Sequence, residues 1–270
     1  MSQLFIRCDQ AGSNTEVAYP DYYDFVAVTA PMDDALRRNT KVEGGPQVAM
    51  SEQDYKIVPV TLKDVEKVLE HLRRFFFREE PLNVCINLLG ERGDEKCQEL
   101  ENYCIQTIPE GLSLMAVTPS DKVVGVILNG SHEPGHLDEM QRNADNCPHA
   151  RFRKILQLLV AVDRGSDVFS KFPDVDKLFE VRIVSVDSAL RGQGIAKALI
   201  EKSRELAKDQ KFPLIRVDCT SHFSARAVAR LGFECVFTLR YEDHCHNGEP
   251  VFRPEIPHNQ VATYVLRLQP

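Results

Sequence analysis

The sequence predicts an α/β fold, and three features of the chain support this prediction. Short apolar runs rich in β-branched residues alternate with longer runs in which apolar residues recur at helical spacing. These runs follow in the order strand, helix, hairpin, helix, strand, helix, strand, helix, strand, strand. A turn with two glycines joins an apolar strand to an amphipathic helix within residues 185–207. We therefore expect one mixed α/β domain over residues 55–270.

The composition of the 270-residue chain narrows the class of protein. An apolar share of 43% with 27% charged residues supplies enough side chains for a large core. The formal net charge of −7 argues against nucleic acid as a partner, because nucleic-acid binding relies on clustered Lys and Arg. No apolar run approaches the ~20 residues that cross a bilayer, so we expect no membrane partner. The eight cysteines form no CxxC pair and the N-terminus lacks a signal-peptide core, which predicts reduced thiols and a cytoplasmic location.

The first 54 residues show neither helical nor strand periodicity. The stretches at 8–17 and 37–53 are polar and contain little that a core could bury. Only the aromatic segment at 18–28 between them has side chains that could dock on a folded domain. Residues 1–54 are therefore predicted to be a poorly ordered N-terminal extension.

The first elements of the domain are a strand and a helix. Residues 55–60 are predicted to form the strand, and the helix follows at 61–77. Thr61 is the expected N-cap, and Asp64 three residues later completes a weak capping box. Pro81 is expected to end this helical region.

The rest of the chain alternates strands with helices. A hairpin is expected, with strands at 112–117 and 122–130, followed by a polar connection over 131–150 and a helix at 151–162. The remaining predicted elements are a strand at 178–186, a helix at 192–209, a strand at 214–219, a helix at 221–231 stopped by Gly232, and strands at 233–241 and 262–268.

The glycine turn has the character of a phosphate-binding loop. The chain contains no Walker sequence, and a dinucleotide fingerprint would need Gly or Ala where Lys197 stands. What remains is Arg191–Ala196, an R-x-x-G-x-A pattern that follows a strand and opens a helix. Consecutive backbone N–H groups at such a helix start can point at a diphosphate. The alternative is a turn that uses glycine only to bend the chain.

This pattern resembles motif A of the GNAT superfamily of acetyl-CoA-dependent N-acetyltransferases, [Q/R]-x-x-G-x-[G/A], which Arg191, Gly194 and Ala196 match. The resemblance implies a mixed, mostly antiparallel central sheet flanked by helices, with acetyl-CoA as co-substrate and no metal. It places the pantetheine arm against Val184, Ser185 and Val186, and the diphosphate against Arg191, Gly192, Gln193, Gly194, Ile195 and Ala196. Ser221 is also assigned to the cofactor, the alternative being an N-cap of the helix that follows it.

Two further stretches resemble the insect arylalkylamine N-acetyltransferases. They are "FFFREEPLN" at 75–83 and "CTSHFSARAVARLGF" at 219–233, and the resemblance covers the chain from about residue 55 to its end. It implies acetyl transfer to an arylalkylamine such as dopamine, octopamine, tyramine or serotonin. The alternatives are an acetyltransferase for polyamines or other aliphatic amines, one that acts on protein N-termini, and a non-catalytic CoA-binding module.

Acetyl transfer to an amine needs a base, because an alkylammonium with a pKa near ~10 has no lone pair for the attack. Glu80 is the candidate, since it follows an apolar aromatic run where burial would raise its pKa. The resemblance assigns the catalytic glutamate to this position before Pro-Leu-Asn. Glu79 and His222 are the alternative bases.

A pair of hydroxyl groups could move the remaining protons. Thr220 and Ser224 stand four residues apart at a strand end and a helix start, so both can face one cleft. The resemblance gives these positions to paired serines that assist proton movement, and Thr220 keeps the hydroxyl but adds a methyl group. The adjacent His and Cys residues of "HCHNGE" at 244–249 cannot converge on one metal ion without further ligands, so no metal site is expected.

Overall fold

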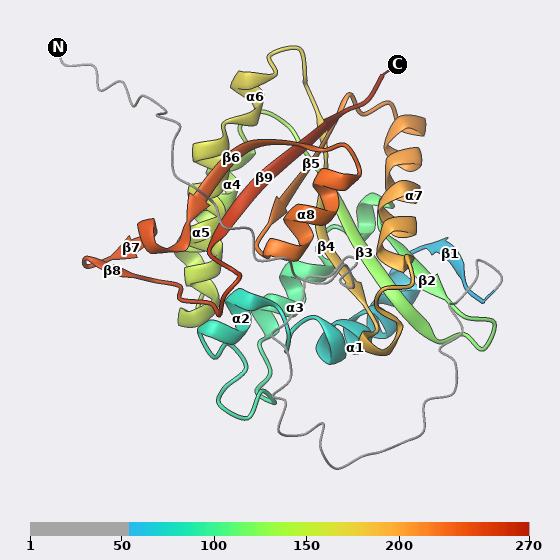
Figure 1. The fold of residues 1–270 in the computed structure, drawn as a ribbon, viewed down its shortest axis with the longest axis horizontal. Helices are drawn as coiled ribbons and strands as arrows, with labels where there is room; N and C mark the ends of the chain where they lie inside the picture. The colour runs from blue at the N-terminus through green and yellow to red at the C-terminus, as the bar shows by residue number, and fades with distance from the viewer. Residues whose placement is uncertain (1–53, 270) are drawn as a thin grey trace, which may run out of the picture.

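The computed structural model describes residues 54–269, and the predicted N-terminal extension lies outside them except for Asp54. A seven-stranded sheet, in the order β1-β2-β3-β4-β5-β9-β6, forms the centre of the molecule (Figure 1). Its strands are β1 (Lys56–Pro59), β2 (Leu114–Val117), β3 (Val123–His132), β4 (Leu178–Val186), β5 (Leu214–Cys219), β6 (Glu234–Arg240) and β9 (Gln260–Arg267). A separate hairpin pairs β7 (Cys245–His246) with β8 (Glu249–Pro250).

Eight helices accompany the sheet in the described part of the chain. They are α1 (Val65–Phe75), α2 (Pro81–Cys85), α3 (Gln98–Ile105), α4 (His136–Asn146), α5 (Ala150–Ser166), α6 (Val168–Lys171), α7 (Ile195–Asp209) and α8 (His222–Arg230). All neighbouring strands of the large sheet pair antiparallel except β4 and β5, which are parallel. The expected α/β fold with a mixed, mostly antiparallel sheet is therefore confirmed.

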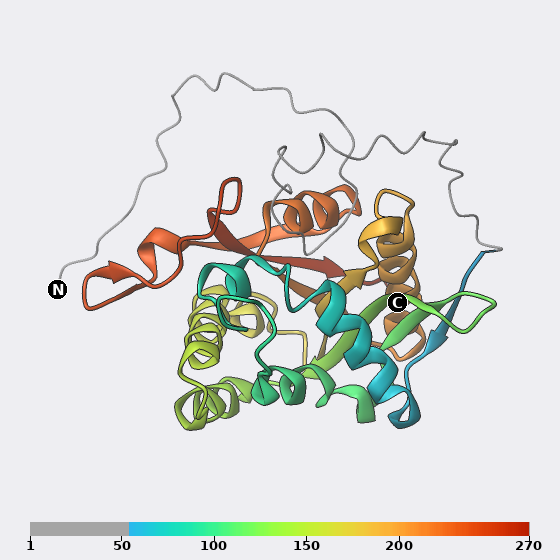
Figure 2. The ribbon, with the colours of Figure 1, turned by 90° about the horizontal axis from the view of Figure 1, so that it is seen from below.

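The sheet is covered on both faces, and each face has its own core. One core joins the sheet to α1, α2, α3 and α5, and the other joins it to α7 and α8. Figure 2 shows these layers, with α1, α3 and α5 on one side of the sheet and α7 and α8 on the other. Among residues 54–269, no helix is both long enough and apolar enough to cross a bilayer.

The helix predicted from Thr61 begins as a 3-10 turn over Leu62–Asp64, α1 follows at Val65, and the helix ends earlier than expected. Thr61 and Asp64 form the expected capping box, in which the Thr61 amide donates to Asp64 Oδ2 at 2.9 Å. The helix ends at Phe75, and Pro81 then begins α2 instead of ending a longer helix. Proline suits the first position of a helix because its missing N–H would have no partner there. Glu80 precedes it as the N-cap.

The sequence-based expectation lacks the helices α2, α3, α4 and α6 and the hairpin of β7 and β8. The connection predicted over 131–150 contains α4, and α3 also went unpredicted. Ala144 is the only buried residue of α4, whereas α3 is short and buries Leu100, Glu101 and Cys104. The hairpin of β7 and β8 was likewise missed. In addition, α7 begins at Ile195 instead of at residue 192, since the glycines before it adopt left-handed backbone conformations.

Candidate active site

The sheet opens between β4 and β5. Their parallel pairing ends at Val181 opposite Val217, although β4 runs on to Val186 and β5 to Cys219. The register against β3 shifts just beyond this point, which makes Arg182 the extra residue of a β-bulge. A bulge bends and twists its strand, so the second half of β4 leaves β5. Backbone groups on the β5 side of this half therefore have no strand partner in the sheet.

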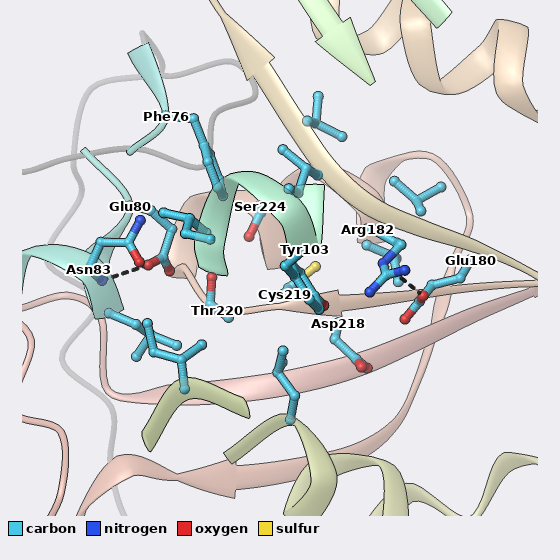
Figure 3. A pocket seen from close by; sticks show the side chains of 18 of the residues that line it. Phe76, Glu80, Asn83, Tyr103, Glu180, Arg182, Asp218, Cys219, Thr220 and Ser224 are labelled. Atoms are coloured by element: carbon cyan, nitrogen blue, oxygen red, sulfur yellow. Dashed lines mark hydrogen bonds and ion pairs between the residues drawn. The ribbon is translucent and has the colours of Figure 1, made fainter. Parts of the chain in front are cut away.

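A cavity of about 120 Å³ lies in this opening and crosses the sheet from one helical layer to the other (Figure 3). Most of the groups that line it are apolar or aromatic. Glu80 and Asn83 lie at one end and Glu180 and Arg182 at the other, with further polar groups between them. The lining residues are Phe76, Glu80, Leu82, Asn83, Leu100, Tyr103, Phe152, Ile155, Leu159, Glu180, Val181, Arg182, Ile183, Val184, Ile200, Val217, Asp218, Cys219, Thr220, Ser224 and Val228.

Glu80 reaches the cavity because it caps α2. Its Oε2 accepts a hydrogen bond from the Asn83 amide at 2.8 Å, which fixes the carboxyl group at the helix start. Its Oε1 has no hydrogen-bond partner among the described residues, although it is buried. Burial raises the pKa of Glu80, while the Asn83 and Leu82 amides and the Thr220 hydroxyl oppose this rise. The result is a buried carboxyl group that faces the cavity and holds a proton more readily than an exposed glutamate does.

The start of α8 brings the predicted hydroxyl groups to the same cavity. Thr220 and Ser224 both line it, and Tyr241 donates from its hydroxyl to the Thr220 carbonyl at 2.6 Å. Ser221 is the N-cap of α8, where its side chain accepts from the Ser224 amide at 3.0 Å. The Ser221 and Ser224 hydroxyl oxygens are 2.9 Å apart. Ser221 thus has the capping role that the sequence offered as its alternative, and it does not line the cavity.

The predicted phosphate loop lines a second cavity, of about 280 Å³, beside α8. Gly192 and Gly194 have φ angles of 75° and 79°, and the space where a Cβ would stand is open at both. Backbone can therefore approach a ligand closely at these two positions. The remaining lining residues are Val186, Leu190, Arg191, Ile195, Ala196, Lys197, Ala227, Arg230 and Leu231. The loop, the start of α7 and three basic side chains together suit a phosphorylated ligand.

The three residues of β4 that the sequence assigned to the pantetheine arm differ in their surroundings. Val184 lines the first cavity and Val186 the second. The Ser185 side chain is buried toward α1, where its hydroxyl lies 3.1 Å from Nε2 of His71. Burial lowers the pKa of His71 to about 4, so its ring is neutral at physiological pH. Ser185 thus offers a ligand its backbone but not its hydroxyl.

Of the two alternative bases, Glu79 forms an ion pair with Arg191 of the phosphate loop. This pair connects the segment before Glu80 with the second cavity. His222 lies at the first position of α8, largely exposed, and it lines neither cavity.

Sequence reasoning missed a buried ionic network at the end of the first cavity opposite Glu80. Glu180 and Arg182 come from β4, and Asp218 comes from β5 with the buried Arg216. Tyr103 of α3 completes this group, since its ring lies 4.4 Å from the Arg182 guanidinium. The signal was present as charged residues inside "LFEVRIVSV" and "LIRVDC", two stretches otherwise apolar enough to be buried strands.

Within residues 54–269, no three His, Cys, Asp or Glu side chains are grouped so that they could hold a metal ion. The seven cysteines of that range are free thiols.

Comparison with known proteins agrees with this geometry. The model of the acetyltransferase (GNAT) family matches residues 69–233. Arylalkylamine N-acetyltransferase 2 from Aedes aegypti is 35% identical, with a TM-score of 0.74, over 80% of this chain and 99% of that one. A Drosophila melanogaster polyamine N-acetyltransferase that forms N-acetylagmatine is 30% identical, with a TM-score of 0.72, over 80% of this chain and all (100%) of that one. A mosquito arylalkylamine N-acetyltransferase like 5b is 27% identical, with a TM-score of 0.73, over 79% of this chain and 100% of that one.

The matched family segment contains the split strands, the phosphate loop and the start of α8, and the first two structures cover most of the described chain at 30% identity or more. This protein therefore belongs to the GNAT family of acetyltransferases.

Proposed function

We propose that this protein transfers the acetyl group of acetyl-CoA directly to the primary amine of an arylalkylamine, of the dopamine, octopamine, tyramine and serotonin class. One observation carries the proposal: Glu80 places a buried carboxyl oxygen without a hydrogen-bond partner, among the described residues, on a cavity that crosses the split sheet. An acyl donor bound along one face of the sheet and an amine bound on the other would meet in that cavity.

Glu80 acts as the general base in this proposal. The acceptor arrives as an ammonium ion, and its proton moves to the Glu80 carboxylate. The free amine nitrogen then bonds to the thioester carbonyl carbon, whose oxygen becomes negative. Backbone N–H groups of β4 beyond Val181 are the proposed donors to that oxygen, because β5 leaves this half of the strand unpaired. Collapse of the intermediate breaks the carbon–sulfur bond and releases the CoA thiolate.

Thr220 and Ser224 are proposed to move the remaining proton to the leaving thiolate. The Thr220 hydroxyl is close enough to Glu80 to lower the pKa of its carboxyl group, and both hydroxyl groups line the cavity. The nitrogen still carries one proton too many after the attack, and this proton would pass through the hydroxyl groups to the sulfur. Glu80 then releases the first proton to solvent, so the base is regenerated.

The second cavity supports acetyl-CoA as the co-substrate. We propose that the amides of Arg191–Ala196 hold the diphosphate, with Lys197 and Arg230 as nearby cations. The unpaired half of β4 at Val184–Val186 would take the pantetheine arm. The free thiols of the described chain fit a reducing compartment such as the cytoplasm, which we propose as the location.

The lining of the first cavity favours an aromatic acceptor. Phe76, Tyr103 and Phe152 present rings, and aliphatic side chains fill the wall between them. A polyamine or agmatine is the second candidate, because a structure 30% identical to this chain is titled as an enzyme that forms N-acetylagmatine.

A panel of amines tests the proposal. The purified full-length protein is given acetyl-CoA with tyramine, dopamine, octopamine, serotonin, agmatine or spermidine, and release of the CoA thiol is followed. We expect the highest kcat/KM among the four arylalkylamines. Turnover of agmatine or spermidine alone would select the second candidate. Acetyl-CoA binding without turnover of any amine would leave a CoA-binding module.

A further inference from the structure

Two carboxylate groups besides Glu80 line the first cavity, and both are already neutralised. Asp218 accepts from Nη2 of Arg216 at 2.9 Å and from the Thr263 hydroxyl at 2.7 Å. Glu180 contacts Nε2 of His132 at 2.8 Å and lies 3.5 Å from Nε of Arg182. A carboxylate with a close cationic partner attracts a further cation weakly, because the partner cancels most of its field.

Arg182 is the neutralising group that reaches the cavity itself. Its side chain is 10% exposed, and Tyr103 covers its guanidinium with an aromatic ring at 4.4 Å. With the Gln106 amide oriented to satisfy both groups, its oxygen accepts from Nη2 and Nη1 of Arg182 at 2.9 and 3.1 Å. These contacts hold the positive charge in one place on the wall.

This charge lies at the far end of the cavity from the proposed base. Figure 3 shows Glu80 and Asn83 at one end and Arg182 with Glu180 at the other. Apolar and aromatic side chains line the wall between the two ends, together with Thr220, Ser224 and the paired Asp218 carboxylate. An acceptor whose amine reaches Glu80 would therefore direct its distal end along this wall toward Arg182.

We propose that Arg182 is a specificity-determining residue that restricts the acceptor to monoamines by cancelling the Glu180 carboxylate at the distal end of the cavity. The inference rests on the proposed function and names the residue that excludes diamines and polyamines from the same cavity. A second ammonium or guanidinium group meets a wall that carries a fixed cation, whereas an aryl or alkyl end meets apolar side chains. Removal of the Arg182 charge takes one cation from the wall and leaves Glu180 with His132 as its close partner, so a diamine should be admitted more readily.

The test compares two acceptors of equal length, hexylamine and cadaverine, which differ in a terminal methyl or ammonium group. In Arg182→Met, the unbranched side chain still fits beneath Tyr103 but carries no charge. We expect the ratio of kcat/KM for cadaverine to that for hexylamine to rise ~10-fold or more, which corresponds to about 1.4 kcal/mol. The matched control, Arg182→Met with Glu180→Gln, has the same apolar replacement but no carboxylate, and it should lose this gain.

The outcomes separate the inference from the proposed function. A folded Arg182→Met protein that binds acetyl-CoA and acetylates hexylamine, yet keeps the wild-type ratio, would overturn the role of Arg182. An equal gain in the double variant would also overturn it, since the carboxylate would then be irrelevant. If wild type acetylates no amine, the proposed function fails instead. Should Arg182→Met not fold, the wild-type ratio decides, because a preference for cadaverine over hexylamine contradicts a wall that repels a distal cation.

Discussion

At the scale of single residues, substitution of Glu80 is expected to reduce kcat/KM more than any other change in the first cavity. The variant Glu80→Gln keeps the size of the side chain but cannot accept a proton, so kcat/KM should fall by roughly 10²–10⁴-fold while acetyl-CoA still binds. Wild-type activity should rise with pH along a limb set by a base whose pKa burial raises, and the variant should lose that limb. Thr220→Val, Ser224→Ala and Glu79→Gln should each reduce kcat/KM less. Near-wild-type kcat/KM in Glu80→Gln would place the base elsewhere.

The same substitution has an expected effect on stability. Since the pKa of Glu80 is raised in the folded state, folding favours the protonated form, and ionisation at neutral pH costs stability. Glu80→Gln removes this cost and should raise the Tm at neutral pH. The gain should shrink as the pH falls through the raised pKa, because wild-type Glu80 is then neutral as well. Thermal unfolding of both proteins across this pH range gives the comparison.

Gly194 allows a test with a matched control. Gly194 and Gly135 are both N-caps in a left-handed conformation, with φ of 79° and 93°, but only Gly194 lines the second cavity. Gly194→Val and Gly135→Val should lose similar stability, of order 1–2 kcal/mol, since a side chain strains this backbone region. Only Gly194→Val should lose acetyl-CoA affinity, by orders of magnitude, in a titration of the folded proteins. Equal affinities would mean that the loop is merely a bend.

At the scale of elements, the sequence predicted those with strong periodicity and missed those without it. Every strand of the large sheet was expected because each is a short run rich in apolar or β-branched residues. Helix α4 was missed because few apolar side chains mark its period, and only Ala144 of them is buried. Pro81 begins α2 because the Glu80 side chain caps this helix by accepting from the Asn83 amide. A single local contact of this kind leaves no periodic pattern in the sequence. In the site, the local sequence and the family resemblance named Glu80, Thr220 and Ser224 as candidates, and all three line the first cavity. The place of Arg182 and Glu180 on the cavity could not be predicted, because it depends on the β-bulge beside which the β4–β5 pairing ends.

The packing of α5 against β6 gives an element-scale prediction. A Cβ built on Gly165 of α5 would lie 2.4 Å from the Phe237 ring of β6. Gly→Ala in an open helix usually stabilises by ~1 kcal/mol, but here the new methyl group should push the strand away and lower the Tm. Gly165→Ala combined with Phe237→Ala should lose less stability than the two single changes added together. A rise in Tm for Gly165→Ala alone would show that the ring moves aside freely.

At the scale of the whole molecule, the proposed boundary before residue 55 can be tested. A chain that begins at Ser51 should keep its Tm and its acetyl-CoA affinity, because residues 1–50 offer little apolar surface to a core. A large drop in Tm would show instead that the aromatic segment at 18–28 packs on the domain.

The split between β4 and β5 divides the large sheet into two blocks that meet at a short seam, the three residue pairs between these strands. Strands β1 to β4 form one antiparallel block and β5, β9 and β6 another, and only the pairs from Phe179–Ile215 to Val181–Val217 join them within the sheet. So short a seam should open more often than either block unfolds, and amide hydrogen exchange should report this as weak protection in the second half of β4. A ligand that pairs with that half would act as a missing strand. Acetyl-CoA should therefore slow amide hydrogen exchange along the seam more than anywhere else in the sheet. The bound acyl donor would then stabilise the same part of the sheet to which it binds.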